Sequence, residues 1–146
     1  MRLRLARPED TQAVAPLFRR SFGSIGFLPT LHTPEEDLAF FGGVIAHQEV
    51  WVAEDESDGA LLGFAGLDGD QLEFLYVDPA SQGHGVGSAL LAHVRARRPG
   101  GFRFWVFQRN ERARRFYERN SCRVVELTDG SGNEEREPDA LYEWRP

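Results

Sequence analysis

Three glycines alternate along a short segment of the chain, and this segment restricts the fold more than any other. Residues 75–91 read LYVDPASQGHGVGSALL, so a hydrophobic strand and a brief turn precede Gly83, Gly85 and Gly87, and an apolar helix follows. Each glycine loses more conformational freedom on folding than any other residue type. Backbone amides at a helix N-terminus bind anions, and glycines let that backbone approach closely. The segment therefore indicates either a phosphate-binding turn or a tightly packed one.

Composition limits the size of the fold and the range of partners. The chain has 146 residues, which suits a single domain over residues 1–146 with one core. Its net charge of −6 argues against nucleic acid or an anionic membrane as a partner, since both require clustered positive charge. No apolar run approaches the roughly 20 residues of a membrane span, so we expect a soluble, cytoplasmic protein. The lone Cys122 excludes an internal disulfide, is expected to be a packing residue, and has no neighbouring ligands that would indicate a metal.

Hydrophobic periodicity and capping signals predict the element order βααβββαβαββ. A capping box at Thr33 and Glu36, with Pro34 between them, starts the second helix, whereas Pro16 should kink or delay the first. Short turns between the central strands favour antiparallel hairpins, and one strand–helix–strand crossover follows. We expect an α+β fold with a mixed, mostly antiparallel sheet of about seven strands and four flanking helices. The predicted strands are 3–6, 49–54, 60–67, 71–77, 102–107, 123–127 and 140–144, and the predicted helices are 10–22, 34–46, 87–98 and 110–120.

Two widespread phosphate-binding motifs do not fit the glycine segment. A P-loop requires a lysine, and this chain contains none. A dinucleotide-binding fold requires GxGxxG and an acid at the end of the next strand. Here the spacing is GxGxG, and Phe107 and Gln108 stand where the acid belongs.

The chain instead resembles the GCN5-related N-acetyltransferases. The QxxGxG pattern at residues 82–87, after a YVDP strand end, is similar to the acyl-CoA-binding motif of this family, and residues 110–117 reproduce its NxxAxxFY helix. The resemblance covers essentially the whole chain and implies that acetyl-CoA is the co-substrate. Amides between residues 83 and 88 would hold the pyrophosphate, while the strand at 75–77 would align the pantetheine arm. The implied cofactor-binding residues are Leu75, Tyr76, Val77, Gln82, Gly83, His84, Gly85, Val86, Gly87, Ser88, Asn110 and Tyr117.

The sequence departs from the family pattern at two places. Relatives often carry Arg or Lys after the first glycine, where this chain has His84, which is either a weaker contact or a solvated loop residue. Relatives usually end the last helix with Gly-Phe, where this chain has Ser121 and Cys122. We expect Asn120 to take the left-handed terminating conformation instead.

The resemblance also implies roles in the chemistry. Tyr117 matches the family's usual general acid toward the CoA thiolate; the alternative is a core aromatic residue beside Phe116. The backbone amide of Leu75 is the candidate for stabilising the oxyanion. Asn110 shares a helix face with Tyr117, and it suits either cofactor contact or a helix N-cap.

Glu73 is the candidate general base. In the predicted strand 71–77, strict alternation places Glu73 on the face of Leu75 and Val77. Burying a carboxylate in a central strand costs free energy unless the group takes part in catalysis or in an ion pair. The alternative is an ion pair with Arg103.

The acceptor is expected between the loop joining the first two helices and the loop before the last strand. An acidic rim beside an apolar wall suits a cationic amine, either a small molecule or a peptide, although a solvated loop remains an alternative. The candidate acceptor residues are Phe27, His32, Glu134 and Glu135. A homodimer is left open. The alternative function is a non-catalytic CoA-binding or regulatory module on the same fold.

Overall fold

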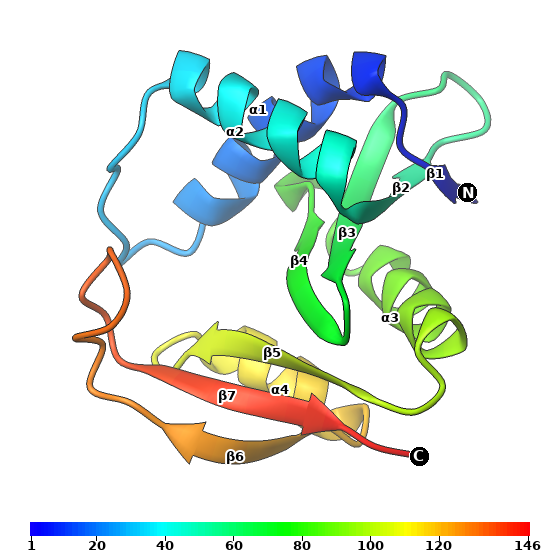
Figure 1. Ribbon diagram of the computed structural model, residues 1–146. Coiled ribbons are helices and arrows are strands. Elements are labelled where there is room, and N and C mark those ends of the chain that lie inside the picture. Colours follow the sequence, from blue (N-terminus) through cyan, green and yellow to red (C-terminus); the bar gives the residue numbers. More distant parts are fainter.

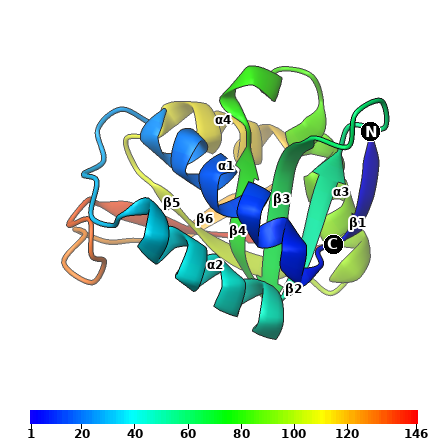
Figure 2. The ribbon, with the colours of Figure 1, turned by 90° about the horizontal axis from the view of Figure 1, so that it is seen from above.

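A computed structural model describes residues 1–146 as one seven-stranded sheet with helices on both faces (Figures 1 and 2). The strand order is β1-β2-β3-β4-β5-β7-β6, in which only the β4–β5 pair is parallel. None of the helices is both long and apolar enough to cross a membrane. The strands are β1 (Arg2–Leu5), β2 (Glu49–Glu54), β3 (Leu61–Asp68), β4 (Gln71–Val77), β5 (Phe102–Phe107), β6 (Arg123–Leu127) and β7 (Asp139–Trp144), and the helices are α1 (Thr11–Gly23), α2 (Pro34–His47), α3 (Val86–Arg97) and α4 (Glu111–Arg119).

The predicted fold class and element order are confirmed, and the bounds differ from the predicted ones by a single residue at most. At the start of α2, the Thr33 hydroxyl accepts from the amide of Glu36, and the Glu36 carboxylate accepts from the amide of Thr33 at 2.8 Å. Helix α1 continues through Pro16 to Gly23. The expected delay of the helix is therefore wrong. Pro16 lies on the exposed side of α1 and has no amide hydrogen to donate to the preceding turn.

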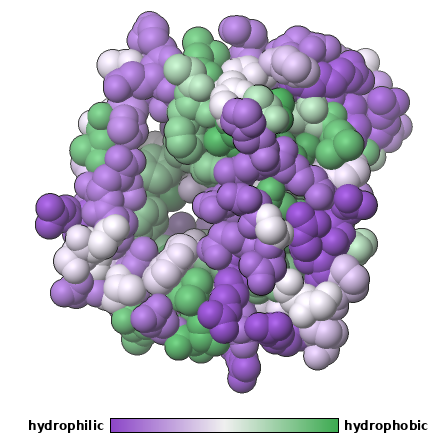
Figure 3. Space-filling model, in the orientation of Figure 1, coloured by the Kyte–Doolittle hydropathy of each residue, from purple (hydrophilic) through white to green (hydrophobic).

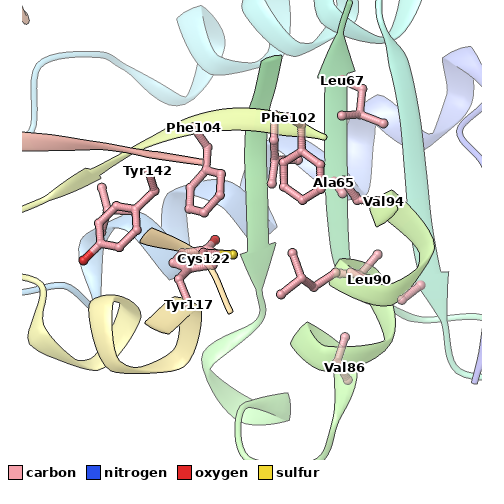
Figure 4. Close-up of a cluster of buried hydrophobic side chains, with 14 of the residues drawn as sticks. Ala65, Leu67, Val86, Leu90, Val94, Phe102, Phe104, Tyr117, Cys122 and Tyr142 are labelled. Atoms are coloured by element: carbon pink, nitrogen blue, oxygen red, sulfur yellow. The ribbon is translucent and has the colours of Figure 1, made fainter. Parts of the chain in front are cut away.

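Two apolar clusters hold the helices on the sheet. One joins α1 and α2 to the first strands through side chains such as Leu17, Phe41 and Phe64. The other joins α3 and α4 to the opposite face, where the Phe104 ring lies 4.4 Å from that of Tyr117 (Figure 4). Cys122 is buried in this second cluster, as expected for a packing residue.

The end of α4 differs from the prediction. Asn120 has φ −99°, and the left-handed residue is Ser121 with φ 66°. The amide of Ser121 donates to the carbonyl of Glu118, and that of Cys122 donates to Tyr117. These two bonds form a Schellman motif, which places the left-handed residue one position after the C-cap. The prediction of Asn120 was therefore wrong by one residue; its side chain instead donates to the Phe116 carbonyl at 2.8 Å.

The predicted strict alternation along β4 is also wrong. Gly66 pairs with Phe74 and Leu67 pairs with Leu72, so Glu73 is an extra residue in a β-bulge. Leu72 consequently lies in the same apolar cluster as Leu75. Glu73 faces the other side of the sheet, with Phe74, because the bulge resets the alternation.

Ser121→Gly is expected to stabilise the fold. The left-handed conformation costs a non-glycine residue about 1–2 kcal/mol, which slightly exceeds the entropic cost of glycine, about 1 kcal/mol. In urea unfolding, we expect the free energy of unfolding to rise by about 0.5 kcal/mol. The matched control is Arg115→Gly in the exposed middle of α4, which should lower the free energy of unfolding by about 1 kcal/mol. Equal losses in both variants would contradict the assignment of the left-handed residue.

Candidate active site

The site begins where β4 and β5 separate. The two strands pair only at Gln71 and Arg103, and beyond this point they diverge (Figure 1). The amide of Asp78 donates to the carbonyl of Leu62 on β3. Hydrogen-bonded pairs alternate along an antiparallel ladder, so the even-numbered residues at this end of β4 bond to β3. The backbone groups of Leu75 and Val77 therefore point toward the opening, where no strand pairs with them.

A cavity of about 840 Å³ lies on one side of this opening, and we refer to it as the donor cavity. Gly83 and Gly85 both adopt left-handed backbone, with φ +81° and +84°, and Gly85 is the residue before α3. The turn thus requires glycine at these two positions. The predicted cofactor residues that line this cavity are Leu75, Tyr76, Val77, Gln82, Gly83, Gly85, Gly87, Ser88, Asn110 and Tyr117.

Two predicted cofactor residues place their side chains elsewhere. The Val86 side chain is buried in the core beneath α3. His84 is exposed, and its Nδ1 lies 3.0 Å from the Gln82 carbonyl oxygen and 3.3 Å from that of Ser81. Val86 could therefore contact a cofactor only through its backbone. The His84 ring turns back onto its own loop.

Three arginines that sequence reasoning did not single out also line the donor cavity: Arg109, Arg112 and Arg119. Arg112 donates to the side-chain oxygen of Gln82 at 2.7 Å, which joins α4 to the glycine turn. These arginines belong to the segment RNERARRFYER, and its clustered positive charge is the sequence signal that could have identified them. Arginine suits recognition of phosphate groups.

Asn110 and Tyr117 come from the two ends of α4. The Asn110 side chain accepts from the amide of Ala113 at 3.2 Å, so it is the N-cap of the helix as well as part of the cavity wall. Tyr117 is 8% exposed and packs on Phe104, and burial raises the pKa of its phenol. Its hydroxyl makes no hydrogen bond within the protein and remains available to a ligand.

A second cavity, of about 1150 Å³, lies on the other side of the opening, and we refer to it as the acceptor cavity. The loop between α1 and α2 and the loop before β7 approach each other beside it (Figure 1). The face of the molecule is hollowed there, with hydrophilic residues around the opening (Figure 3). Of the residues predicted from the sequence, Glu73, His32, Glu134 and Glu135 line this cavity. Phe27 does not: it lines the donor cavity, beneath the guanidinium of Arg109 at 4.3 Å, so its expected place was wrong.

The acceptor cavity is acidic, and two of its carboxylates lack a partner. Glu73 makes no ion pair, and desolvation by the cavity wall raises its pKa, with a smaller contribution from Asp68. The alternative pair with Arg103 is not formed, because that guanidinium lies 3.3 Å from Glu143. Burial likewise raises the pKa of Glu135, and the charge of Glu134 adds to it.

One contact closes the outer edge of the acceptor cavity. The Nε2 atom of His32 lies 3.0 Å from a carboxylate oxygen of Glu134. This hydrogen bond raises the pKa of His32, so the contact is strongest when the imidazole is protonated and weakens as the pH rises through that pKa. Both side chains are exposed, so solvent screens the pair.

Comparison with known sequences gives three relatives. A family model described as an acetyltransferase (GNAT) domain matches residues 46–120. The peptidyl-lysine N-acetyltransferase YjaB of Escherichia coli is 30% identical over 125 residues, which cover 84% of this chain and 82% of YjaB. YjaB of Salmonella typhimurium is 28% identical over 84% of this chain and 83% of its own length. The peptidyl-lysine N-acetyltransferase YiaC of E. coli is 34% identical over 56% of this chain and 55% of YiaC.

Solved structures share the fold. The solution structure of apo YjaB from E. coli matches with a TM-score of 0.80 and 24% identity, covering 98% of this chain and 96% of that one. The PaiA N-acetyltransferase of Thermoplasma acidophilum, in complex with coenzyme A, matches with a TM-score of 0.77 and 20% identity over 100% of both chains.

Proposed function

Because the chain belongs to the GCN5-related N-acetyltransferase family and is an acyltransferase, we propose that it transfers an acetyl group from acetyl-CoA to a cationic amine, with the lysine side chain of a peptide as acceptor. One observation carries the proposal. An arginine-lined cavity behind the glycine turn and an acid-lined cavity in front of Glu73 meet at the opening between β4 and β5.

The donor cavity fits acetyl-CoA through its shape and its charge. The left-handed turn at Gly83 and Gly85 presents backbone amides at the N-terminus of α3, where the helix dipole favours a pyrophosphate. Leu75 and Val77 offer backbone groups that no neighbouring strand pairs, and an extended pantetheine arm can bond to them. Arg112 and Arg119, both on α4, supply positive charge at this cavity.

The acceptor cavity fits a protonated amine. Unpaired carboxylates at Glu73 and Glu135 attract an ammonium, and aromatic residues such as Phe40 and Trp105 can hold the aliphatic part of the chain. The two YjaB proteins and YiaC are named peptidyl-lysine N-acetyltransferases, which supports lysine over a small amine.

In the proposed reaction, the Glu73 carboxylate takes a proton from the ammonium, and the free amine attacks the thioester carbonyl carbon. The amide of Leu75 stabilises the oxygen as negative charge develops on it. Tyr117 gives its proton to the departing thiolate. The raised phenol pKa keeps Tyr117 protonated at neutral pH, as this role requires.

Binding of acetyl-CoA is tested by thermal unfolding. Acetyl-CoA or free CoA at about a hundredfold its Kd should stabilise the protein by about 2.7 kcal/mol, a shift of a few degrees, whereas ATP should not. Gly87→Glu should abolish the shift, because its carboxylate would enter the cavity and repel the phosphates. Gly87→Ala is the matched control: the added Cβ would lie 3.5 Å from Phe116, an ordinary contact. A full shift in Gly87→Glu would reject the donor cavity as the CoA site.

Acceptor choice is tested by CoA thiol release with two peptides. A peptide with a blocked N-terminus and one lysine should be acetylated, whereas a peptide with a free α-amine and no lysine should react slowly. Glu135→Gln should raise the KM for the lysine peptide about fivefold, the equivalent of about 1 kcal/mol. Glu56→Gln, an exposed acid outside both cavities, should leave the KM unchanged. A preference for the α-amine peptide would overturn the proposed acceptor.

The pH dependence of kcat/KM tests Glu73. A general base must be ionised, so the rate should fall as the pH drops through the Glu73 pKa, which lies above its ordinary 4.5. Glu73→Gln should lower kcat by about 10²-fold or more. Asp68→Asn removes one cause of the raised pKa, so it should move the acidic limb to lower pH while kcat is kept. Unchanged kcat in Glu73→Gln would remove Glu73 from the mechanism.

A further inference from the structure

The half of the sheet formed by β5, β7 and β6 has one face that α1 and α2 leave uncovered (Figure 1). Along β5, Phe102, Phe104 and Val106 are buried in the cluster that holds α3 and α4. Since side chains alternate along a strand, Arg103 and Trp105 point to the other side. The apolar cluster beneath α1 and α2 contains no residue of these three strands, and both side chains are exposed. We refer to this side of the three strands as the open face.

Three arginines on the open face share one carboxylate. Glu143 of β7 pairs with Arg103 of β5 on one side and with Arg123 of β6 on the other. Its oxygens lie 2.8 Å from Arg123, 3.3 Å from Arg103 and 3.4 Å from Arg145, which follows β7. The Glu143 side chain is 5% exposed, whereas the three arginine side chains are largely exposed. The group therefore presents an excess of positive charge to solvent, in a chain whose net charge is −6.

These arginines keep hydrogen-bond donors that the protein does not use. Arg103 donates to Glu143 only through Nε, so both of its terminal nitrogens are free. Arg123 donates through Nε and one terminal nitrogen, and its other terminal nitrogen is free. A guanidinium presents its donors in a planar fork that fits a carboxylate. The group is thus able to bind a second carboxylate besides that of Glu143.

Trp105 connects the arginine group to the acceptor cavity. It lines that cavity, and its side chain lies on the same face as Arg103, two residues away along β5. Two residues of a strand span about 6.6 Å. Phe107, the next residue on this face, packs on Phe22 of α1 with ring centroids 6.4 Å apart, and both line the cavity. The open face therefore runs from the acceptor cavity directly to the arginines.

We propose that the open face binds the part of the acceptor peptide beside its lysine, and that Arg103 and Arg123 select a glutamate or aspartate two residues from that lysine. This inference rests on the proposed acetyl transfer and names the class of peptide that its acceptor cavity takes. The lysine enters the acidic cavity, and the acidic residue meets the arginines. Trp105 and Leu141, which pair across β5 and β7, provide an apolar surface between the two. Peptide and protein thus match in charge and in spacing.

The sign of this preference distinguishes it from the general field of the protein. The net charge of −6 and the carboxylates of the acceptor cavity both repel an acidic peptide. Arg19, which also lines that cavity, is already bound to Asp37 at 3.0 Å and to the His32 carbonyl at 2.8 Å. Without the arginine group, a glutamate near the lysine should therefore weaken binding relative to glutamine. A preference for glutamate requires a local positive group.

The test uses three peptides with blocked termini and one lysine, measured by CoA thiol release. One carries glutamate two residues before the lysine, one carries it two residues after, and the third has glutamine at both positions. At low salt, one glutamate peptide should have a KM about threefold lower than the glutamine peptide, and about 1 M salt should remove the difference.

Two variants assign the preference to the arginines. Arg103→Gln and Arg123→Gln should each raise the KM of the glutamate peptide toward that of the glutamine peptide. Each leaves Glu143 with two arginines, so thermal unfolding should stay near that of the wild type. The matched control is Arg2→Gln at the opposite edge of the sheet, an exposed arginine that likewise pairs with a glutamate, Glu54 at 3.4 Å. It should keep the full preference.

Three outcomes would overturn the inference. The first is a KM for both glutamate peptides that equals or exceeds that of the glutamine peptide. The second is a preference for glutamate that survives in both arginine variants. The third is an equal benefit from a glutamate placed six residues from the lysine, which would indicate general attraction rather than a contact.

Fluorescence anisotropy with labelled peptides measures the same preference without catalysis. If the wild-type protein released no thiol with any peptide, the proposed function would fail. Tighter binding of a glutamate peptide, lost in the two arginine variants, would still support the open face as the binding surface. Equal binding of the glutamate and glutamine peptides would reject it.

Discussion

The divergence of β4 from β5 beyond the Gln71–Arg103 pair is the constraint on which the site depends. In a continuous sheet, neighbouring strands would satisfy every backbone N–H and C=O of a central strand. Because β5 turns away, the backbone polar groups of Leu75 and Val77 face an opening, and the Val77 carbonyl is met only by the side-chain amide of Gln82 at 3.3 Å. Both cavities lie beside this opening, and Tyr76 of β4 lines each of them. Under the proposed function, one missing strand pairing would supply both the backbone contacts to the cofactor and the place where the two substrates meet.

The parts of the structure that could be predicted from sequence depend on signals within a few residues. The capping box of Thr33 and Glu36 specifies the start of α2 because both partners lie in one helical turn. Gly83 and Gly85 adopt the left-handed backbone that only glycine takes without cost, so the turn before α3 could be predicted from these two residues. Asn110 caps α4 for the same local reason.

The parts that could not be predicted depend on pairing between distant residues. The face of Glu73 is reversed by a bulge that arises from the register of β4 against β3, and no local pattern encodes it. Phe27 lies at the donor cavity because Arg109, far along the chain, packs on its ring. Tyr76 was expected to contact the cofactor, but that it lines both cavities follows only once α1, α4 and the loop before β7 are in position.

The charges of the two cavities also bear on turnover under the proposed function. Arginines on the donor side attract an anionic cofactor, while the carboxylates of Glu73 and Glu135 attract a cationic amine, so each substrate is favoured at its own entrance. Acetylation turns the ammonium into a neutral amide and thereby removes the charge that the acceptor cavity recognises. The carboxylates that attract the ammonium of the substrate therefore do not attract the neutral amide of the product. Release of the acetylated chain is therefore favoured, and the raised pKa of Glu73 helps the carboxylate to take up the proton that the ammonium must lose.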